Sequence, residues 1–119
     1  MTISQVSVID LVNYLDRGDL ADLPSELAVQ LVDVREPEEL AIAYIEGFMN
    51  LPLSQFETWG DRIHTLLDRD TETLVLCHHG VRSMQMCQWL TQQGFTNVKN
   101  IANGIDAYSQ QVDNSIPFY

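Results

Sequence analysis

The chain has 119 residues, 45% of them hydrophobic, and its 17 acidic residues outnumber its 6 lysines and arginines to give a formal net charge of −11. This length is sufficient for one domain whose core needs no metal or disulfide. The negative charge repels phosphate groups, which disfavours nucleic acids and anionic membranes as partners. No apolar stretch approaches the roughly 20 residues of a membrane span, and the N-terminus lacks a targeting pattern, so a cytoplasmic protein is expected.

The start of the chain predicts a short strand and a helix. Gln5 and Val6 suit a strand, and Ser7 with Asp10 three residues later has the pattern of a helix N-cap. Gly18 is expected to end this helix. Apolar residues recur between them at helical spacing at Val8, Leu11, Val12 and Leu15.

The next segment predicts two strands and two helices. Residues 19–28 are expected to form a loop and Val29–Val34 a buried strand. The proline and acids of residues 36–39 predict a helix start, because proline fits the first turn and carboxylates favour the positive end of the helix dipole. Phe48–Leu51 is expected to be a strand, followed after a proline by a helix over Ser54–Leu67. The core-facing residues of that helix are predicted to be Ile63, Leu66 and Leu67.

The second half continues to alternate strands with helices. Thr73–Leu76 predicts a strand covered on both faces, and the helix-forming run Arg82–Gln93 stops at Gly94. The apolar tail Val112–Tyr119 is expected to pack on the body, with a partner-binding tail as the alternative. The remaining expected elements are a strand at Val98–Ile101 and a helix at Ile105–Gln111. This alternation predicts an α/β fold with a mainly parallel sheet of about five strands flanked by helices.

Cys77 stands where the strand Thr73–Leu76 ends, at the start of a connection over residues 78–82. Ligands bind beyond the carboxyl ends of the strands in such sheets, which places this cysteine at the expected site. A short loop entering a helix points N–H groups inward, with the positive end of the helix dipole behind them. This environment favours a thiolate, so we expect Cys77 to be reactive and accessible rather than an inert buried residue.

The residues Cys-His-His-Gly-Val-Arg-Ser at 77–83 resemble the active-site loop of single-domain rhodanese-like sulfurtransferases. The similarity extends through residues 31–36, 47–53 and 98–108, and the order of these motifs is more specific than any one of them. The resemblance implies a single rhodanese-like domain over residues 1–119, with helices on both faces of the sheet.

The resemblance also implies transfer of a sulfane sulfur. The Cys77 thiolate would take the terminal sulfur of a small donor such as thiosulfate, release sulfite and hold the sulfur as a persulfide. Backbone N–H groups of residues 78–82 would stabilise the negative terminal sulfur. The family suggests cyanide, a small thiol or a protein thiol as the acceptor, and no metal or organic cofactor is required.

Two other functions compete with sulfur transfer. Cysteine-dependent phosphatases, some of which share this fold, have one more residue between cysteine and arginine than separates Cys77 from Arg82, and carry histidine where this chain has Leu76. The shorter loop suits a single sulfur atom and disfavours a phosphatase or arsenate reductase. A non-catalytic interaction module, which typically lacks the cysteine, and a protein-to-protein sulfur carrier stay open as alternatives.

Further polar residues are expected around the sulfur. Arg35 is placed to meet an anionic donor and Asp33 to pair with Arg82, with a purely structural ion pair as the alternative for both. Arg82 is expected to brace the loop with a fixed positive charge. Ser83 is expected to support the loop or line the substrate rim, and Cys87 to be a core residue, with a resolving thiol as the alternative.

The loop histidines are expected to shape the mouth of the site. Proton transfer by His78 or His79 is left open. A metal site is not expected, because adjacent histidines do not easily turn toward one ion and the sequence offers no evident third ligand. Gly80 is expected to allow a positive φ, and Val81 completes the loop. Asn103-Gly104, where the family often has paired glycines, is expected to concern packing.

Overall fold

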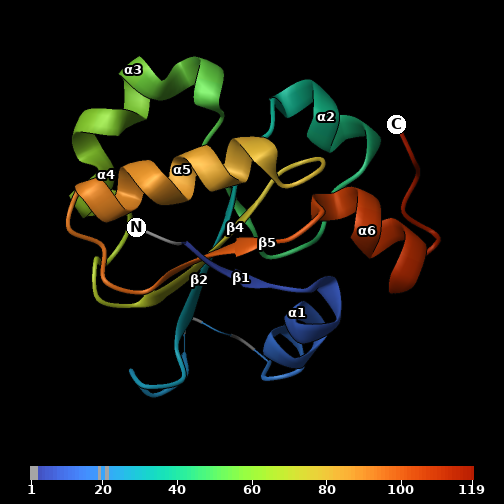
Figure 1. Cartoon of the computed structure of the whole chain (residues 1–119), viewed down its shortest axis with the longest axis horizontal. Helices are drawn as coiled ribbons and strands as arrows, with labels where there is room; N and C mark the ends of the chain where they lie inside the picture. The colour runs from blue at the N-terminus through green and yellow to red at the C-terminus, as the bar shows by residue number, and fades with distance from the viewer. Residues whose placement is uncertain (1–2, 19, 21) are drawn as a thin grey trace.

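The computed structural model describes residues 3–18, 20 and 22–119. In this part of the chain, five strands form one sheet in the order β1-β5-β4-β2-β3, and every neighbouring pair is parallel (Figure 1). The strands are β1 (Ser4–Val6), β2 (Val29–Asp33), β3 (Met49–Asn50), β4 (Glu72–Leu76) and β5 (Val98–Ile101). The α/β class and the parallel sheet predicted from alternating strands and helices are confirmed.

Helices cover both faces of the sheet (Figure 1). One face carries α1 (Val8–Leu15) and α6 (Gly104–Gln111), and the other carries α3 (Phe56–Trp59), α4 (Ile63–Leu66) and α5 (Val81–Gln92). The short α2 (Pro37–Ile42) follows β2. Within the described residues, every helix is too short or too polar to cross a membrane.

The central strand β4 divides its side chains between these two layers. Leu74 and Leu76 belong to the hydrophobic cluster of α1 and α6, whereas Val75 and Cys77 belong to the cluster of α5. This is the two-residue alternation of a strand with both faces covered. The Cys77 side chain therefore starts on the α5 side of the sheet.

Local signals in the sequence fix the starts of the first two helices. Ser7 Oγ accepts a hydrogen bond from the Asp10 N–H at 3.0 Å, and the Asp10 carboxylate accepts one from the Ser7 N–H at 3.1 Å. This confirms the predicted N-cap of α1, although the helix ends at Leu15, before Gly18. Helix α2 begins at Pro37, as predicted.

The continuous helix predicted over Ser54–Leu67 is wrong. The segment is split into η1 (Leu53–Gln55), α3, η2 (Gly60–Arg62) and α4. Gly60 disfavours a helix interior, and the Trp59 indole N–H donates to the Pro52 carbonyl at 2.8 Å, which holds the chain in a bend. Of the predicted core residues, Ile63 and Leu67 are buried and Leu66 is partly buried.

The C-terminal tail, residues 112–119, packs on the body as predicted. Ile116 packs against the cluster of α1 and α6, and its carbonyl accepts a hydrogen bond from the Ser109 hydroxyl. The Tyr119 ring stacks on His78. The tail therefore ends beside the connection that follows β4.

Candidate functional site

The connection from β4 to α5 is shorter than predicted. Gly80 has a φ of +99° and is the N-cap of α5, so Val81 and Arg82 already belong to the first helical turn. The positive φ at Gly80 is the one predicted, since a residue without Cβ adopts it at no steric cost. The Cys77 sulfur therefore faces a loop of only three residues, His78, His79 and Gly80, before the helix begins.

Helix α6 fixes the backbone of this loop from the other side of the sheet. The Ile105 N–H donates to the Cys77 carbonyl at 2.9 Å, and the Asp106 N–H donates to the His78 carbonyl at 3.1 Å. A Cβ on Gly104 would lie 2.6 Å from the His78 carbonyl carbon and closer still to the two carbonyl oxygens. Only glycine fits there, so Gly104 positions the loop. The sequence had indicated only a packing role.

The Cys77 sulfur lies in a network of buried polar groups. The Gly80 N–H donates to Sγ at 3.0 Å, and Ser83 Oγ lies 3.2 Å from Sγ. The Ser83 hydroxyl donates to Asn100 Oδ1, and Asn100 Nδ2 donates to the Gly80 carbonyl at 3.1 Å. The sequence did not indicate Asn100, because Lys99 beside it in the strand Val98–Ile101 is polar too, and only the structure shows that Asn100 is buried.

The expectation of an accessible sulfur is wrong. Cys77 is 1% exposed, because the loop and the first turn of α5 fold over it. Ser83 is fully buried beside it. A donor therefore reaches Sγ only if a neighbouring group moves.

The two arginines predicted near the sulfur each pair with a carboxylate, and the expected pair of Asp33 with Arg82 is not formed. Arg35 Nη2 lies 2.8 Å from Asp33 Oδ2, and both residues are buried. Arg82 does not pair with Asp33, because Nη1 and Nη2 donate to the two oxygens of Glu39 at 2.7 and 2.9 Å. The alternative of a structural ion pair is thus the one observed for both Asp33 and Arg35.

Glu39 holds Arg82 while it also caps α2. Its Oε2 accepts the Glu36 N–H at 2.9 Å, which is the helix role expected of the acids in residues 36–39. Hydrogen bonds from Arg82, more than any other group, lower the Glu39 pKa to about 2. The same pairing raises the pKa of Arg82. The fixed charge of Arg82 is therefore largely neutralised by its partner.

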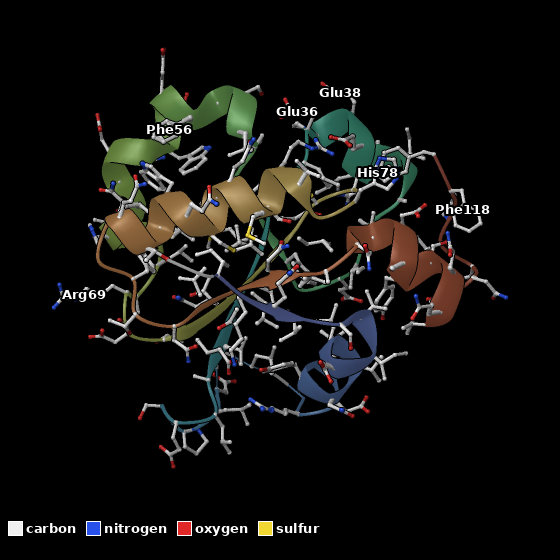
Figure 2. The ribbon with its side chains drawn as sticks, viewed as in Figure 1. Glu36, Glu38, Phe56, Arg69, His78 and Phe118 are labelled. Carbon is white, nitrogen blue, oxygen red and sulfur yellow. The ribbon has the colours of Figure 1, made fainter. Side chains whose placement is uncertain are left out.

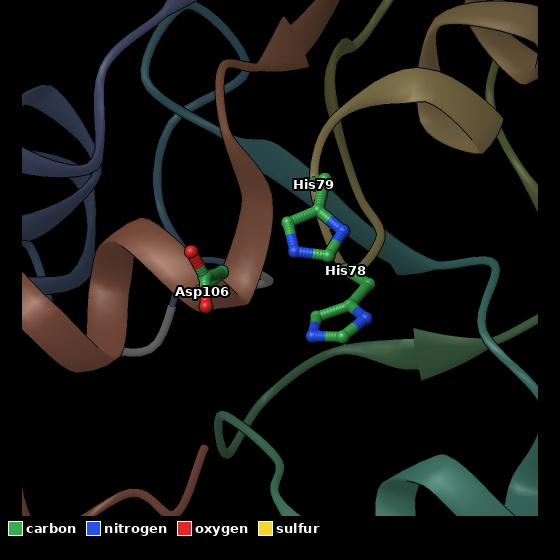
Figure 3. Close-up of side chains that lie close together, drawn as sticks. All are labelled: His78, His79 and Asp106. Atoms are coloured by element: carbon green, nitrogen blue, oxygen red, sulfur yellow. The ribbon is translucent and has the colours of Figure 1, made fainter. Parts of the chain in front are cut away.

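His78, His79 and Asp106 bring three potential ligand groups together (Figure 3). One ligand atom from each residue lies within 4.8 Å of the other two. Asp106 is therefore the third potential metal ligand, which the sequence did not indicate. The two imidazole rings stack with centroids 3.9 Å apart and planes 29° apart. A metal needs ring nitrogens that converge on it at about 2.0–2.1 Å, which rings so close to parallel do not offer.

Tyr119 is a residue of this site that the sequence did not indicate. Its ring stacks on His78 with centroids 3.9 Å apart and planes 6° apart, and its hydroxyl accepts from Arg35 Nη1 at 2.9 Å. The hydroxyl also donates to Glu39 Oε1 at 3.0 Å. Figure 2 shows the tail that carries Phe118 beside His78. Burial, followed by the neighbouring His79, lowers the pKa of His78.

Cys87 lies inside the hydrophobic cluster of α5. It is fully buried, and that burial, with a smaller contribution from the charge of Cys77, raises its pKa to about 12. A thiol in such surroundings is inert. The structure therefore favours the predicted core role over that of a resolving thiol.

Comparisons with known proteins agree on one family. A family model described as "Rhodanese-like domain" matches residues 16–111. A sulfurtransferase from Allochromatium vinosum is 33% identical over 101 residues, which cover 84% of this chain and 91% of that protein. The Rhodanese-like/PpiC domain-containing protein 12, chloroplastic, of Arabidopsis thaliana is 53% identical over 90 residues, 76% of this chain.

A solved structure shares the fold. The rhodanese-related protein from Thermoplasma volcanium has a TM-score of 0.70 and 27% sequence identity, with 92% of this chain and 93% of that one covered. The chain spans only 30% of the Arabidopsis protein, so the activity of that whole protein does not transfer directly.

Proposed function

Since the chain belongs to the rhodanese-like domain family, we propose that it is a sulfurtransferase in which Cys77 carries the transferred sulfur as a persulfide. The observation that carries the proposal is the placement of Cys77 Sγ against the Gly80 N–H, at 3.0 Å, at the N-terminus of α5. Peptide N–H groups and the helix dipole at this point stabilise a negative sulfur. The A. vinosum relative named as a sulfurtransferase supports the same chemistry.

The proposed reaction has two displacements. The Cys77 thiolate attacks the outer sulfur of thiosulfate; a new S–S bond forms, the original S–S bond breaks, and its electron pair leaves with sulfite. The persulfide then carries one negative charge on its terminal sulfur, which the Gly80 N–H and the other amides of residues 78–82 would stabilise as donors. An acceptor thiolate or cyanide attacks that sulfur, and the electron pair returns to Cys77 as thiolate.

A sulfur carrier that receives sulfur from another protein is the second candidate function. It is favoured by the pairing of Arg35 and Arg82 with carboxylates. Because both arginines near the Cys77 loop are paired with carboxylates, they leave little unbalanced positive charge to attract a free dianion such as thiosulfate. A protein or small-molecule persulfide, with less charge to place, is the donor class that this candidate requires.

Intact-mass measurement after incubation with thiosulfate tests the proposal. The wild-type protein and Cys87→Ala should each gain one sulfur atom, and Cys77→Ser should gain none. The adduct should be released by cyanide or a thiol. An adduct that persists in Cys77→Ser would refute the site, and rapid turnover of an aryl phosphate without any sulfur adduct would favour a phosphatase.

Slow loading from thiosulfate with fast loading from a persulfide donor would favour the carrier.

A cytoplasmic location is also part of the proposal, and the two free cysteines suit a reducing compartment. The name of the Arabidopsis relative places that protein in the chloroplast.

A further inference from the structure

We propose that Asn100 is a positioning residue that acts through Ser83: it fixes the direction of a closed ring of hydrogen bonds that holds the Cys77 sulfur as a thiol. The ring also includes the backbone N–H and carbonyl of Gly80. Its importance for sulfur transfer rests on the proposed function, whereas the direction of the ring and its effect on the thiol do not.

The ring begins and ends on the backbone of Gly80. The Gly80 N–H donates to Cys77 Sγ at 3.0 Å, and the Gly80 carbonyl accepts from Asn100 Nδ2 at 3.1 Å. Between these two ends, Sγ lies 3.2 Å from Ser83 Oγ, which contacts Asn100 Oδ1. Cys77, Ser83 and Asn100 are each at most 1% exposed. The members of the ring therefore bond to one another rather than to water.

The two ends fix the direction of every bond in the ring. A backbone N–H only donates and a backbone carbonyl only accepts. The amide nitrogen of Asn100 must therefore face the Gly80 carbonyl, which turns Oδ1 toward Ser83. Because Oδ1 only accepts, the single hydroxyl proton of Ser83 is used there. Ser83 thus presents a lone pair to Sγ, and the bond between them forms when Cys77 carries its proton.

Ionisation of Cys77 breaks this ring. When the thiol proton leaves to a base in the solvent, Sγ still accepts from the Gly80 N–H but faces a lone pair of the Ser83 oxygen. The hydroxyl donates to the thiolate only if it turns away from Asn100, which leaves Oδ1 buried without a donor. An unpaired buried acceptor is costly. Asn100 thus withholds a second donor from the negative sulfur and opposes the effect of the Gly80 N–H.

The remaining titratable groups around Cys77 and its loop lie outside the ring. Arg35 and Arg82 are each paired with a carboxylate. The other groups belong to the loop, α5 and α6, and are His78, His79, Cys87 and Asp106. Substitutions at positions 83 and 100 leave all of these side chains in place. A change in the ionisation of Cys77 in such variants therefore reports on the ring.

The ratio of thiolate to thiol at Cys77 tests this inference without sulfur transfer. It is measured from the ultraviolet absorbance of the thiolate over the pH range in which thiols ionise, with Cys77→Ser in each background as the blank. The full chain is compared with Ser83→Ala, Asn100→Leu and the double variant. Gln5→Ala is the matched control, because Gln5 is exposed and only accepts a second bond from Asn100 Nδ2, at 3.1 Å. Thermal unfolding of each variant verifies that it is folded.

Ser83→Ala removes a group that only accepts from the thiol, so it should raise the thiolate-to-thiol ratio or leave it unchanged. Asn100→Leu frees the Ser83 hydroxyl to donate to Sγ. At a given pH the ratio should then rise about tenfold, the factor for one hydrogen bond of about 1.4 kcal/mol. Adding Ser83→Ala to Asn100→Leu should cancel most of this rise. Gln5→Ala should stay within about twofold of wild type, since exposed side chains contribute little.

A lower ratio in folded Ser83→Ala would show that the hydroxyl donates to the sulfur and would overturn the inference. This variant alone decides the direction of the ring if Asn100→Leu does not fold. An unchanged ratio in folded Asn100→Leu would overturn the role of Asn100. So would a rise that persists when Ser83→Ala is added, because a loosened loop would then be the cause.

Intact mass after incubation with thiosulfate tests the proposed function on the same variants. If the ratios change as expected but no variant gains sulfur, the proposed function fails and the ring stands. If the wild type gains sulfur while the ratio is the same in Asn100→Leu and wild type, the proposed function stands and the role of Asn100 fails.

Discussion

Glu39 and Arg82 join the first turns of α2 and α5 through two parallel hydrogen bonds of 2.7 and 2.9 Å. The two residues are 43 positions apart, and both are partly buried. The pair holds the helix that starts immediately after the Cys77 loop. Its loss should therefore affect both the stability of the fold and the chemistry of the sulfur.

The acid stability of the protein should depend on Glu39. Its folded-state pKa is lowered from 4.5 to about 2, so the stabilisation is fully present above pH 4.5 and is lost as the pH falls through about 2. Glu39→Gln should lower the free energy of unfolding by about 1 kcal/mol at pH 7, allowing for solvent screening. Urea unfolding between pH 2 and pH 7 measures this difference, which should vanish at the acid end. Glu38→Gln, an exposed acid in the same turn, should change little, and equal effects of the two substitutions would contradict the assignment.

Arg82→Ala should slow persulfide formation on Cys77 about tenfold or more, because the Glu39 carboxylate is left unpaired near a sulfur that must carry negative charge. The double variant with Glu39→Gln should recover part of that rate. Loading followed by intact mass provides the measurement, with the exposed Arg69→Ala as the control. An unchanged rate in Arg82→Ala would remove its electrostatic role.

Gly104→Ala should disrupt the site more than any other glycine substitution at positive φ. Gly18 and Gly104 both have positive φ, but a Cβ on Gly18 would meet nothing within 4 Å, whereas one on Gly104 would overlap the backbone of Cys77 and His78. Gly18→Ala should therefore cost only backbone strain, about 1–2 kcal/mol. Gly104→Ala should cost more than about 4 kcal/mol, the range of exceptional substitutions, and should abolish sulfur loading. Similar unfolding free energies for the two variants would show that the loop accommodates the methyl group.

Cys87 should act only through packing. Cys87→Ala should lower the free energy of unfolding by about 1 kcal/mol, and Cys87→Ser by about 1–3 kcal/mol because it buries a hydroxyl in an apolar cluster. Both variants should load sulfur on Cys77 at the wild-type rate. A loss of turnover with intact folding in Cys87→Ala would restore the resolving-thiol hypothesis.

The sequence predicted those strands and helix starts that are specified by residues close together in the chain. The run Thr73–Leu76 with Cys77 after it specified a buried strand that ends in a thiol, and Ser7 with Asp10 specified a helix start. These signals lie within a few residues of the feature they describe. The broken helix over Ser54–Leu67 was missed because Trp59 bonds to a carbonyl seven residues earlier, which overrides helix propensity.

The parts of the site that were not predicted depend on contacts between distant residues. Arg82 pairs with Glu39, Ser83 bonds to Asn100, and Tyr119 bonds to Arg35 across 84 positions. A single sequence carries no signal for which carboxylate an arginine will reach. The burial of Cys77 was missed for a different reason, since the residues that cover it are its neighbours in the chain, but their sequence does not show how closely the loop and the first turn of α5 fold over the sulfur.

The carbonyl of Cys77 accepts a hydrogen bond from α6, while its sulfur contacts Gly80 and Ser83 at the start of α5, so Cys77 is anchored to both helical layers of the domain. If sulfur loading moves the backbone of Cys77 and His78, the hydrogen bonds that the Ile105 and Asp106 amides donate to their carbonyls should change. Their amide hydrogens therefore form a spectroscopic reporter of the state of the sulfur, on a helix that carries no residue of the loop itself.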